Sequence, residues 1–238
     1  MERREFLTTR WSLVEAAGGS DSERARAALA ELCADYWYPL YAYVRRCGVD
    51  ADQAQDVVQG FFADLIERGD LGRLTRGAGR FRGFLKVAVR NHLSNVRDRE
   101  RAAKRGGGRV RLAVDLEGAA ERYAREPATE EAPERAFDRL WALELLERCV
   151  AELEAEYASS GRGPVFAELK GALQGGDEGL DSAAAAARLH TSEGALRVAV
   201  HRLRKRFGER LRARIAETVA SPAEVEDELD DLFRALGG

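Results

Sequence analysis

The sequence predicts an all-α protein made of two helical domains joined by an acidic linker. Apolar residues recur at helical spacing along much of the chain, and the strong helix formers Ala, Leu, Arg and Glu are abundant against only five prolines. At roughly 150 residues per domain, 238 residues suit one or two domains. Charged residues gather in alternating basic and acidic blocks, which favours two domains.

The net charge of −3 conceals two strongly basic segments. Arg73–Arg111 carries 13 Lys or Arg residues against two acidic ones, and Arg188–Arg214 carries nine against two. Acidic residues dominate two other segments, with seven in Asp115–Ala136 and seven in Glu217–Phe233. Because the basic segments are also amphipathic, they predict two surfaces that bind nucleic acid.

Several classes of protein do not fit this composition. No apolar run approaches the roughly 18 residues that span a bilayer, and no apolar segment follows the Arg-rich start, so we expect a cytoplasmic protein without membrane contact. Three scattered cysteines (Cys33, Cys47 and Cys149) and three dispersed histidines favour neither a disulfide framework nor a metal site. A Ser/His/Asp set and a phosphate-binding glycine loop are also missing. We therefore expect no enzymatic activity, no metal and no cofactor.

Residues 1–107 are predicted to form the first domain, which begins with an apolar helix face from Leu29 to Val44. Pro39 lies inside that helix and should kink it near Tyr38. A second helix is expected from about residue 50 to residue 68. Its inward residues are Val58, Phe61, Phe62, Leu65 and Ile66. Its opposite, polar face carries Asp52, Asp56, Gln59 and Glu67.

The third helix is predicted from Phe81 to about Arg105, after a glycine-rich loop at 69–79 that carries Arg73 and Arg76 and is followed by Arg80. One side of the helical wheel is apolar or aromatic and carries Phe81, Phe84, Leu85, Ala88 and His92. The other side forms a basic stripe of Arg82, Lys86, Arg90, Arg97 and Arg101. Cations that follow a phosphate backbone, with aromatic rings nearby, suit a single strand or a partly opened duplex.

The second domain is predicted at 136–216, after a flexible acidic linker at 108–135. It should open with a helix that ends near Tyr157, followed by a glycine-rich insert at 158–179 that contains one small helix. Residues 217–238 should form an acidic amphipathic helix or tail.

The segment from Ser182 to Arg206 predicts a helix-turn-helix. A short Ala-rich helix is followed by a break at His190, and Ser192 is a good N-cap for a longer helix to about Ile215. The apolar face of that second helix holds Leu196, Ala199, Val200, Leu203 and Phe207. The outward residues, as in a recognition helix, are Ser192, Glu193, Arg197, Val198, His201, Arg202 and Lys205. Arg197 is suited to bidentate pairing with a guanine edge.

Three stretches, in this order, resemble bacterial extracytoplasmic-function sigma factors, a class of the sigma-70 superfamily. ADQAQDVVQGFFADLIERG resembles their region two-two, and GRFRGFLKVAVRNHLSNVRDRERAAKRGGG resembles regions two-three and two-four. LDSAAAAARLHTSEGALRVAVHRLRKRF resembles region four-two. The resemblance covers roughly residues 6–215, and the acidic linker and chain length agree with it.

The resemblance implies that the chain binds promoter DNA and bacterial core RNA polymerase, through the β′ clamp and the β flap. The region two-two match places the clamp contact on Asp52, Asp56, Gln59 and Glu67. The region two-three match assigns strand separation and a flipped minus-ten base to the residues from Arg73 to Arg80 together with Phe84, Arg90 and Asn91. The region four-two match places the outward residues from Ser192 to His201 in the major groove of the minus-thirty-five element.

The chain departs from the family pattern at three positions. Gly60 stands where an acidic residue is common, Ala185 where a larger aliphatic residue is common, and His190 at the usual turn glycine. No sensor domain follows the helix-turn-helix, so control by another protein, such as an anti-sigma factor, is expected.

Three other functions fit part of the sequence. A helix-turn-helix regulator that binds duplex DNA as a dimer would explain the second domain, but would leave the basic aromatic helix of the first without a task. An enzyme acting on nucleic acid lacks clustered carboxylates or metal ligands. A sigma-like protein that only sequesters a partner is the third alternative.

Overall fold

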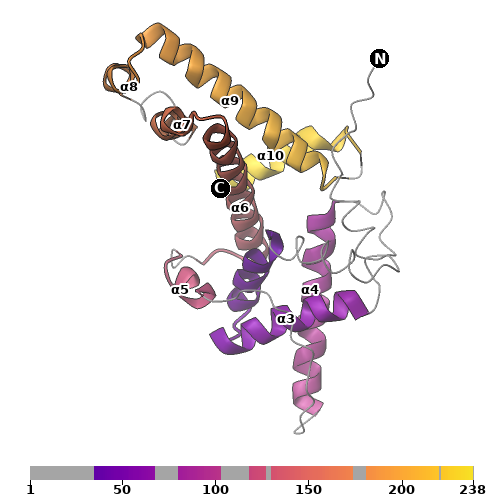
Figure 1. The fold of residues 1–238 in the computed structure, drawn as a ribbon. Helices are drawn as coiled ribbons and strands as arrows, with labels where there is room; N and C mark the ends of the chain where they lie inside the picture. The colour runs from indigo at the N-terminus through magenta and orange to yellow at the C-terminus, as the bar shows by residue number, and fades with distance from the viewer. Residues whose placement is uncertain are drawn as a thin grey trace. The chain divides into compact units, whose positions relative to one another are not determined.

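The computed structural model describes residues 35–67, 80–102, 118–126, 130–173, 181–219 and 221–237. Every regular element in these ranges is a helix, which confirms the predicted all-α class (Figure 1). Within these ranges no helix is both long enough and apolar enough to cross a membrane. The chain divides into two compact units, one comprising Met1–Leu143 with Ile215–Gly238 and the other Glu144–Arg214.

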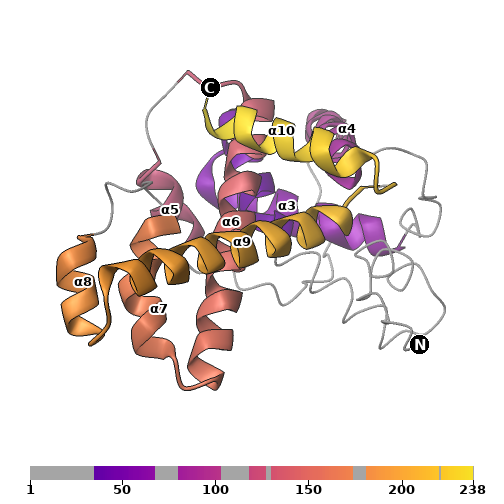
Figure 2. The ribbon, with the colours of Figure 1, turned by 90° about the horizontal axis from the view of Figure 1, so that it is seen from above.

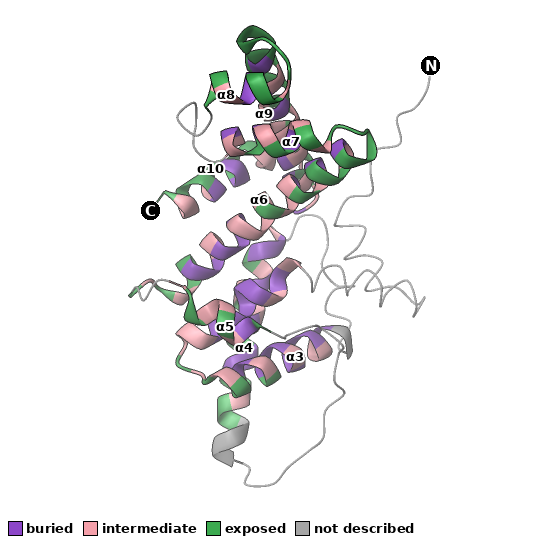
Figure 3. Cartoon of the chain, turned by 60° about the vertical axis from the view of Figure 1, so that its left-hand side comes forward, coloured by how far each residue is buried: buried purple, intermediate pink, exposed green. Residues whose placement is uncertain are grey.

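The first unit contains a helix over 35–46, α3 (Ala51–Glu67), α4 (Phe81–Ala102), α5 (Ala119–Ala124), the start of α6 (Pro133–Ser159) and α10 (Glu224–Leu236). Asp50 begins α3, because its side chain accepts a hydrogen bond from the Gln53 N–H at 2.9 Å. The predicted inward face of α3 is confirmed, and its burial can be followed in Figure 3. Its members are Val58, Phe61, Phe62 and Leu65. The side chain of Ile66 lies outside the described residues.

α4 is held at its first residue by a distant part of the chain. The Phe81 N–H donates to the carbonyl oxygen of Thr218 at 3.3 Å, which satisfies one of the N–H groups that a helix start leaves unpaired. On the apolar or aromatic side identified from the sequence, Phe81, Leu85 and His92 are buried, and Phe84 and Ala88 are half-buried. The helix is described to Ala102, so the end predicted near Arg105 lies outside the described residues.

The predicted flexible linker at 108–135 is corrected by its described residues. Residues 119–124 form α5, and α6 begins at Pro133 rather than after 135. The Tyr123 ring of α5 packs edge-on against Tyr41, with ring centroids 6.1 Å apart. Arg139 pairs with Glu126 at 3.1 Å and Glu131 at 3.2 Å. Two acidic residues of this segment, Glu126 and Glu131, are therefore fixed by a partner in the same unit. Composition alone does not reveal this.

The acidic C-terminal segment, predicted as a separate helix or tail, is helical as α10 and groups with the first unit. Leu229 and Leu232 are buried, and so is the acidic residue Glu228. A fully buried carboxylate requires a fixed partner, which for Glu228 is Arg82 of α4.

The second unit contains the rest of α6, α7 (Gly163–Leu169), the 3-10 helix η2 (Lys170–Leu173), α8 (Ser182–Arg188) and most of α9 (Glu193–Ala216). The small helix predicted within the insert at 158–179 is present as α7. Its Phe166 and Leu169 are fully buried, and the Phe166 ring packs on Tyr157 at a centroid distance of 5.4 Å. This segment therefore contributes to the hydrophobic core of the unit, together with Leu153, Leu196, Val200 and Leu203.

The turn between α8 and α9 has the geometry of a helix C-terminal cap. The His190 N–H donates to the carbonyl of Ala187 at 3.2 Å, and the Thr191 N–H donates to that of Ala186 at 2.9 Å. This pair of bonds defines a Schellman motif, whose central residue adopts the left-handed conformation. His190 has a φ of 50°. This position, where the sequence resemblance leads us to expect glycine, is therefore left-handed in this chain although it carries histidine.

Leu203→Ala should destabilise the second unit by about 2–5 kcal/mol, because it removes a fully buried side chain and leaves a cavity. Val198 is on the same helix but 50% exposed, so Val198→Ala should change the free energy of unfolding by less than about 0.5 kcal/mol. Chemical denaturation of both variants gives the comparison. Equal losses would mean that the assigned inward face of α9 is wrong.

Candidate nucleic-acid interfaces

The N-terminal half of α9 presents an exposed polar face. Ser192 caps the helix, its Oγ accepting from the Ala195 N–H at 3.2 Å. Burial of Leu196 and Leu203 fixes which side of the helix points outward. All seven residues predicted to contact the upstream element are exposed: Ser192, Glu193, Arg197, Val198, His201, Arg202 and Lys205. The face thus presents a guanidinium, a group that can pair with a guanine edge, and an apolar side chain, a group that can contact a thymine methyl.

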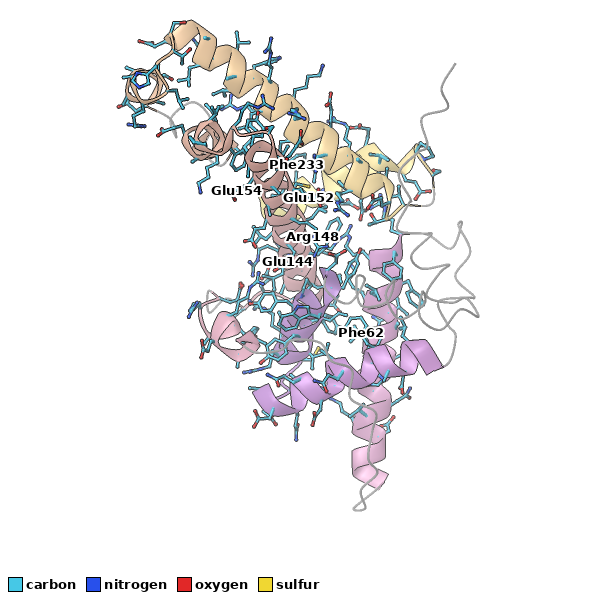
Figure 4. The ribbon with its side chains drawn as sticks, in the orientation of Figure 1. Phe62, Glu144, Arg148, Glu152, Glu154 and Phe233 are labelled. Carbon is cyan, nitrogen blue, oxygen red and sulfur yellow. The ribbon has the colours of Figure 1, made fainter. Side chains whose placement is uncertain are left out.

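The C-terminal half of α9 uses its arginines differently. Arg210 donates to Glu152 at 3.0 Å and to Glu156 at 2.8 Å, while Arg206 also pairs with Glu156 and Arg214 with Glu152. Figure 4 shows Glu152 on the α9-facing side of α6 and Glu154 on the other side. The basic run on α9 therefore divides into an exposed half and a half that holds α6 within the second unit.

This network shifts the ionisation of Glu152. Burial alone would raise the pKa of its carboxyl, but hydrogen bonds from Arg214 and Arg210, with their positive charge, more than offset that effect. The pKa of Glu152 consequently lies below its ordinary value of 4.5.

The predicted basic stripe of α4 has two distinct parts. Arg82 is only 5% exposed, so the expectation that it faces solvent is wrong. Its Nε and Nη2 donate to the two carboxylate oxygens of Glu228, each at 3.0 Å, and its Nη1 donates to Asp138. The guanidinium also lies 4.6 Å from the Trp141 ring centroid. Burial by itself would lower the pKa of Arg82, but the hydrogen bonds and charges of Glu228 and Asp138 raise it by more. The pKa therefore lies above its ordinary value, and the group stays charged.

The neighbours of Arg82 are also paired with acidic residues. Lys86 Nζ donates to both oxygens of Asp138 at 2.9 Å. Arg80 pairs with Glu228 at 2.8 Å and with Asp231. Further along α4, Arg90 is exposed, and the exposed Arg97 donates to the Cys47 carbonyl at 2.6 Å. Arg73, Arg76 and the side chain of Arg101 lie outside the described residues.

The polar face of α3 is placed as predicted where it is described. Asp52 and Asp56 are exposed, and Gln59 is half-buried. The side chain of Glu67 lies outside the described residues. This face can form charge-assisted contacts with a basic partner surface.

A pocket of about 230 Å³ lies between α3 and α4. Two of the predicted base-binding residues, Phe84 and Asn91, line it. Asn95 adds a second exposed amide one turn further along α4, and Phe61 adds a second ring. Sequence reasoning missed Asn95, although its spacing of four residues from Asn91 places both on one helix face.

His92 and Asp64 form one wall of this pocket. His92 Nδ1 lies 3.0 Å from an Asp64 carboxylate oxygen, and its ring packs edge-on against Phe61 at 5.8 Å. These contacts fix the imidazole in position. Aromatic walls with amides at the rim can accept a planar, hydrogen-bonding ring of the size of one base.

Acid should weaken the second unit through Glu152. Because its folded pKa lies below 4.5, the carboxylate contributes its full stabilisation above that pH and loses it as pH falls through the folded value. Glu152→Gln should therefore lower the thermal midpoint at neutral pH and flatten its decline below pH 4.5. Glu154 is exposed on the opposite side of α6, so Glu154→Gln should keep the wild-type slope. Parallel wild-type and Glu152→Gln curves below pH 4.5 would contradict the assignment.

We found no match to this chain among protein-family models, curated proteins or solved structures.

Proposed function

We propose that this chain acts as a sigma factor of the extracytoplasmic-function type, which binds core RNA polymerase, recognises two promoter elements and promotes strand opening. The observation that supports the proposal is that two different surfaces, one in each unit, have the chemistry to bind nucleic acid. One is the exposed face of a capped recognition helix, and the other is a base-sized pocket beside exposed cations of α4. A protein that only reads duplex DNA needs the first surface alone.

Recognition of the upstream element would start at α9. Base edges are reached by the N-terminal part of a recognition helix, where Arg197 and Val198 are exposed. A bidentate arginine–guanine pair discriminates by about 1–3 kcal/mol. Lys205, two turns further on, is placed for a phosphate, which positions the helix without reading sequence.

Strand opening would draw on the pocket between α3 and α4. Unstacking one base from a duplex costs a few kcal/mol, which stacking and hydrogen bonds in a pocket must offset. Phe84 and Phe61 supply the aromatic surfaces, and the amides of Asn91 and Asn95 can pair with a base edge. Arg90 and Arg97 extend along the same helix for the strand backbone. This opening would use binding energy and no hydrolysis.

The polymerase contact would use the exposed acidic face of α3. Asp52 and Asp56 lie on the side of α3 away from its buried apolar face. The resemblance to sigma region two-two assigns this face to the β′ clamp. The resemblance to sigma factors as a whole also implies a contact with the β flap.

The decisive test is transcription in vitro with purified core RNA polymerase on a promoter library. A sigma factor should confer start sites that core enzyme alone does not use. Asp56→Arg should reduce core binding and these transcripts together, because it reverses an exposed charge against a basic partner. Absence of any chain-dependent start site would reject the proposal.

Asn91→Ala combined with Asn95→Ala should impair opening of a fully paired template. Core binding should persist, and a template already mismatched at the minus-ten position should restore activity in part, because its base is unstacked in advance. Permanganate footprinting measures opening on both templates. Ser94→Ala is the control, since Ser94 is exposed on α4 between the two asparagines but does not line the pocket. Normal opening by the double variant would exclude the pocket from this role.

Arg197→Ala should cost about 1–3 kcal/mol on the preferred upstream element and relax preference at one base position. Lys205→Ala should instead weaken all sequences alike and reduce the salt dependence of binding. Binding to a randomised duplex pool separates the two effects. Uniform weakening by Arg197→Ala would identify it as a phosphate contact.

A duplex-binding regulator is the alternative, and one observation favours it. Arg80, Arg82 and Lys86 are engaged by carboxylates, whereas the recognition face of α9 is exposed. Such a regulator would bind promoter duplexes equally well with and without core polymerase, and would confer no start sites.

A further inference from the structure

α10 is an acidic helix that lies beside α4 (Figure 2), and its carboxylates contact basic side chains of that helix. Glu228 is fully buried against Arg82, and Asp231, one turn further along α10, pairs with Arg80. Leu229 and Leu232 are buried within the same unit. Two of the cations predicted to hold phosphates are thus covered by carboxylates from a segment 146 residues away.

The chemistry of this contact differs from that of an ordinary core. A buried ion pair contributes little net stability, because the cost of desolvation offsets most of the Coulomb attraction. Apolar residues of similar volume would often give equal or greater stability. A carboxylate that accepts two hydrogen bonds from a guanidinium has, however, the same geometry as a phosphate oxygen pair. The carboxylates of Glu228 and Asp231 therefore bind the cations of α4 in a way that the phosphates of a nucleic-acid backbone could also adopt.

An open approach to these cations exists beside α10. A cavity of about 510 Å³ is lined by Arg80, Lys86, Arg135 and Arg234, with Asp138 and Asp231 between them. Arg80 and Lys86 keep 28% and 24% of their side-chain surfaces exposed. A phosphate could therefore contact part of the cluster while α10 is still in place.

We propose that α10 is an intramolecular competitor of nucleic acid, whose carboxylates hold the phosphate-binding side of α4 until a strand displaces them. The inference rests on the proposed function only in taking α4 as a strand-binding helix. A helix of 13 residues is marginal by itself, so α10 would loosen once its contacts are exchanged. Its short connection to α9 would keep it close enough to rebind.

The first test measures the affinity of the full chain for a fluorescent single-stranded oligodeoxynucleotide of mixed sequence. Glu228→Gln with Asp231→Asn should tighten binding roughly tenfold and steepen its salt dependence, because more cations become available to phosphates. Asp227→Asn with Asp230→Asn is the matched control, since it removes the same formal charge from the exposed side of α10. The control should change affinity less than twofold, because it alters only the long-range repulsion between α10 and the strand, which salt screens. Equal tightening in both double variants, or no change in either, would overturn the inference.

A second measurement uses the unaltered chain and so avoids any loss of folding in the variants. Hydrogen exchange of the α10 amides should accelerate when the same oligonucleotide saturates the protein, while the α7 amides in the second unit stay protected. Unchanged or slower exchange in α10 would overturn competition. Chain-dependent transcription is scored separately. If it is absent while the strand still releases α10, the proposed function fails and this inference stands. If chain-dependent transcription is present while the strand leaves α10 unaffected, the proposed function stands and this inference fails.

Discussion

The buried guanidinium of Arg82 is the constraint on which the first unit depends. A charge removed from water must keep its partners, and Arg82 has three partners on two helices: Glu228 from α10, and Asp138 and the Trp141 ring from α6. These partners specify how the end of the chain meets α4. The Phe81–Thr218 hydrogen bond lies in the same neighbourhood and adds a second, uncharged link between the same segments.

Local pattern was sufficient to predict α7, α8 and α9 of the second unit, but not η2. Apolar spacing on α9 identified Leu196, Val200 and Leu203 as inward, and the Ser192 cap and the break at His190 marked the turn between α8 and α9. These features depend on residues only a few positions apart. The exposed face of α9 follows directly, because the outward side of a helix is fixed once its inward side is known.

The basic stripe of α4 could not be predicted in the same way. A helical wheel treats all charged residues as solvent-facing, whereas Arg82 and Lys86 meet carboxylates that come from other helices. The acidic segment at 108–135 led to the opposite error. Its composition predicts a flexible linker, but Glu126 and Glu131 are fixed by ion pairs with Arg139. Complementary charges far apart in sequence are a signal for such contacts, but the sequence alone does not say which of them pair.

The first unit is discontinuous along the chain, and this has a consequence for synthesis. Arg82 and Glu228 are separated by 146 residues, so at about 5–20 residues per second the ribosome completes Glu228 roughly 7–30 s after Arg82. The whole second unit, Glu144–Arg214, is made within that interval. Until α10 has been made, Asp138 is therefore the carboxylate left to pair with Arg82 and Lys86, and the nascent chain carries a partly uncovered basic helix while it is attached to an RNA-rich ribosome.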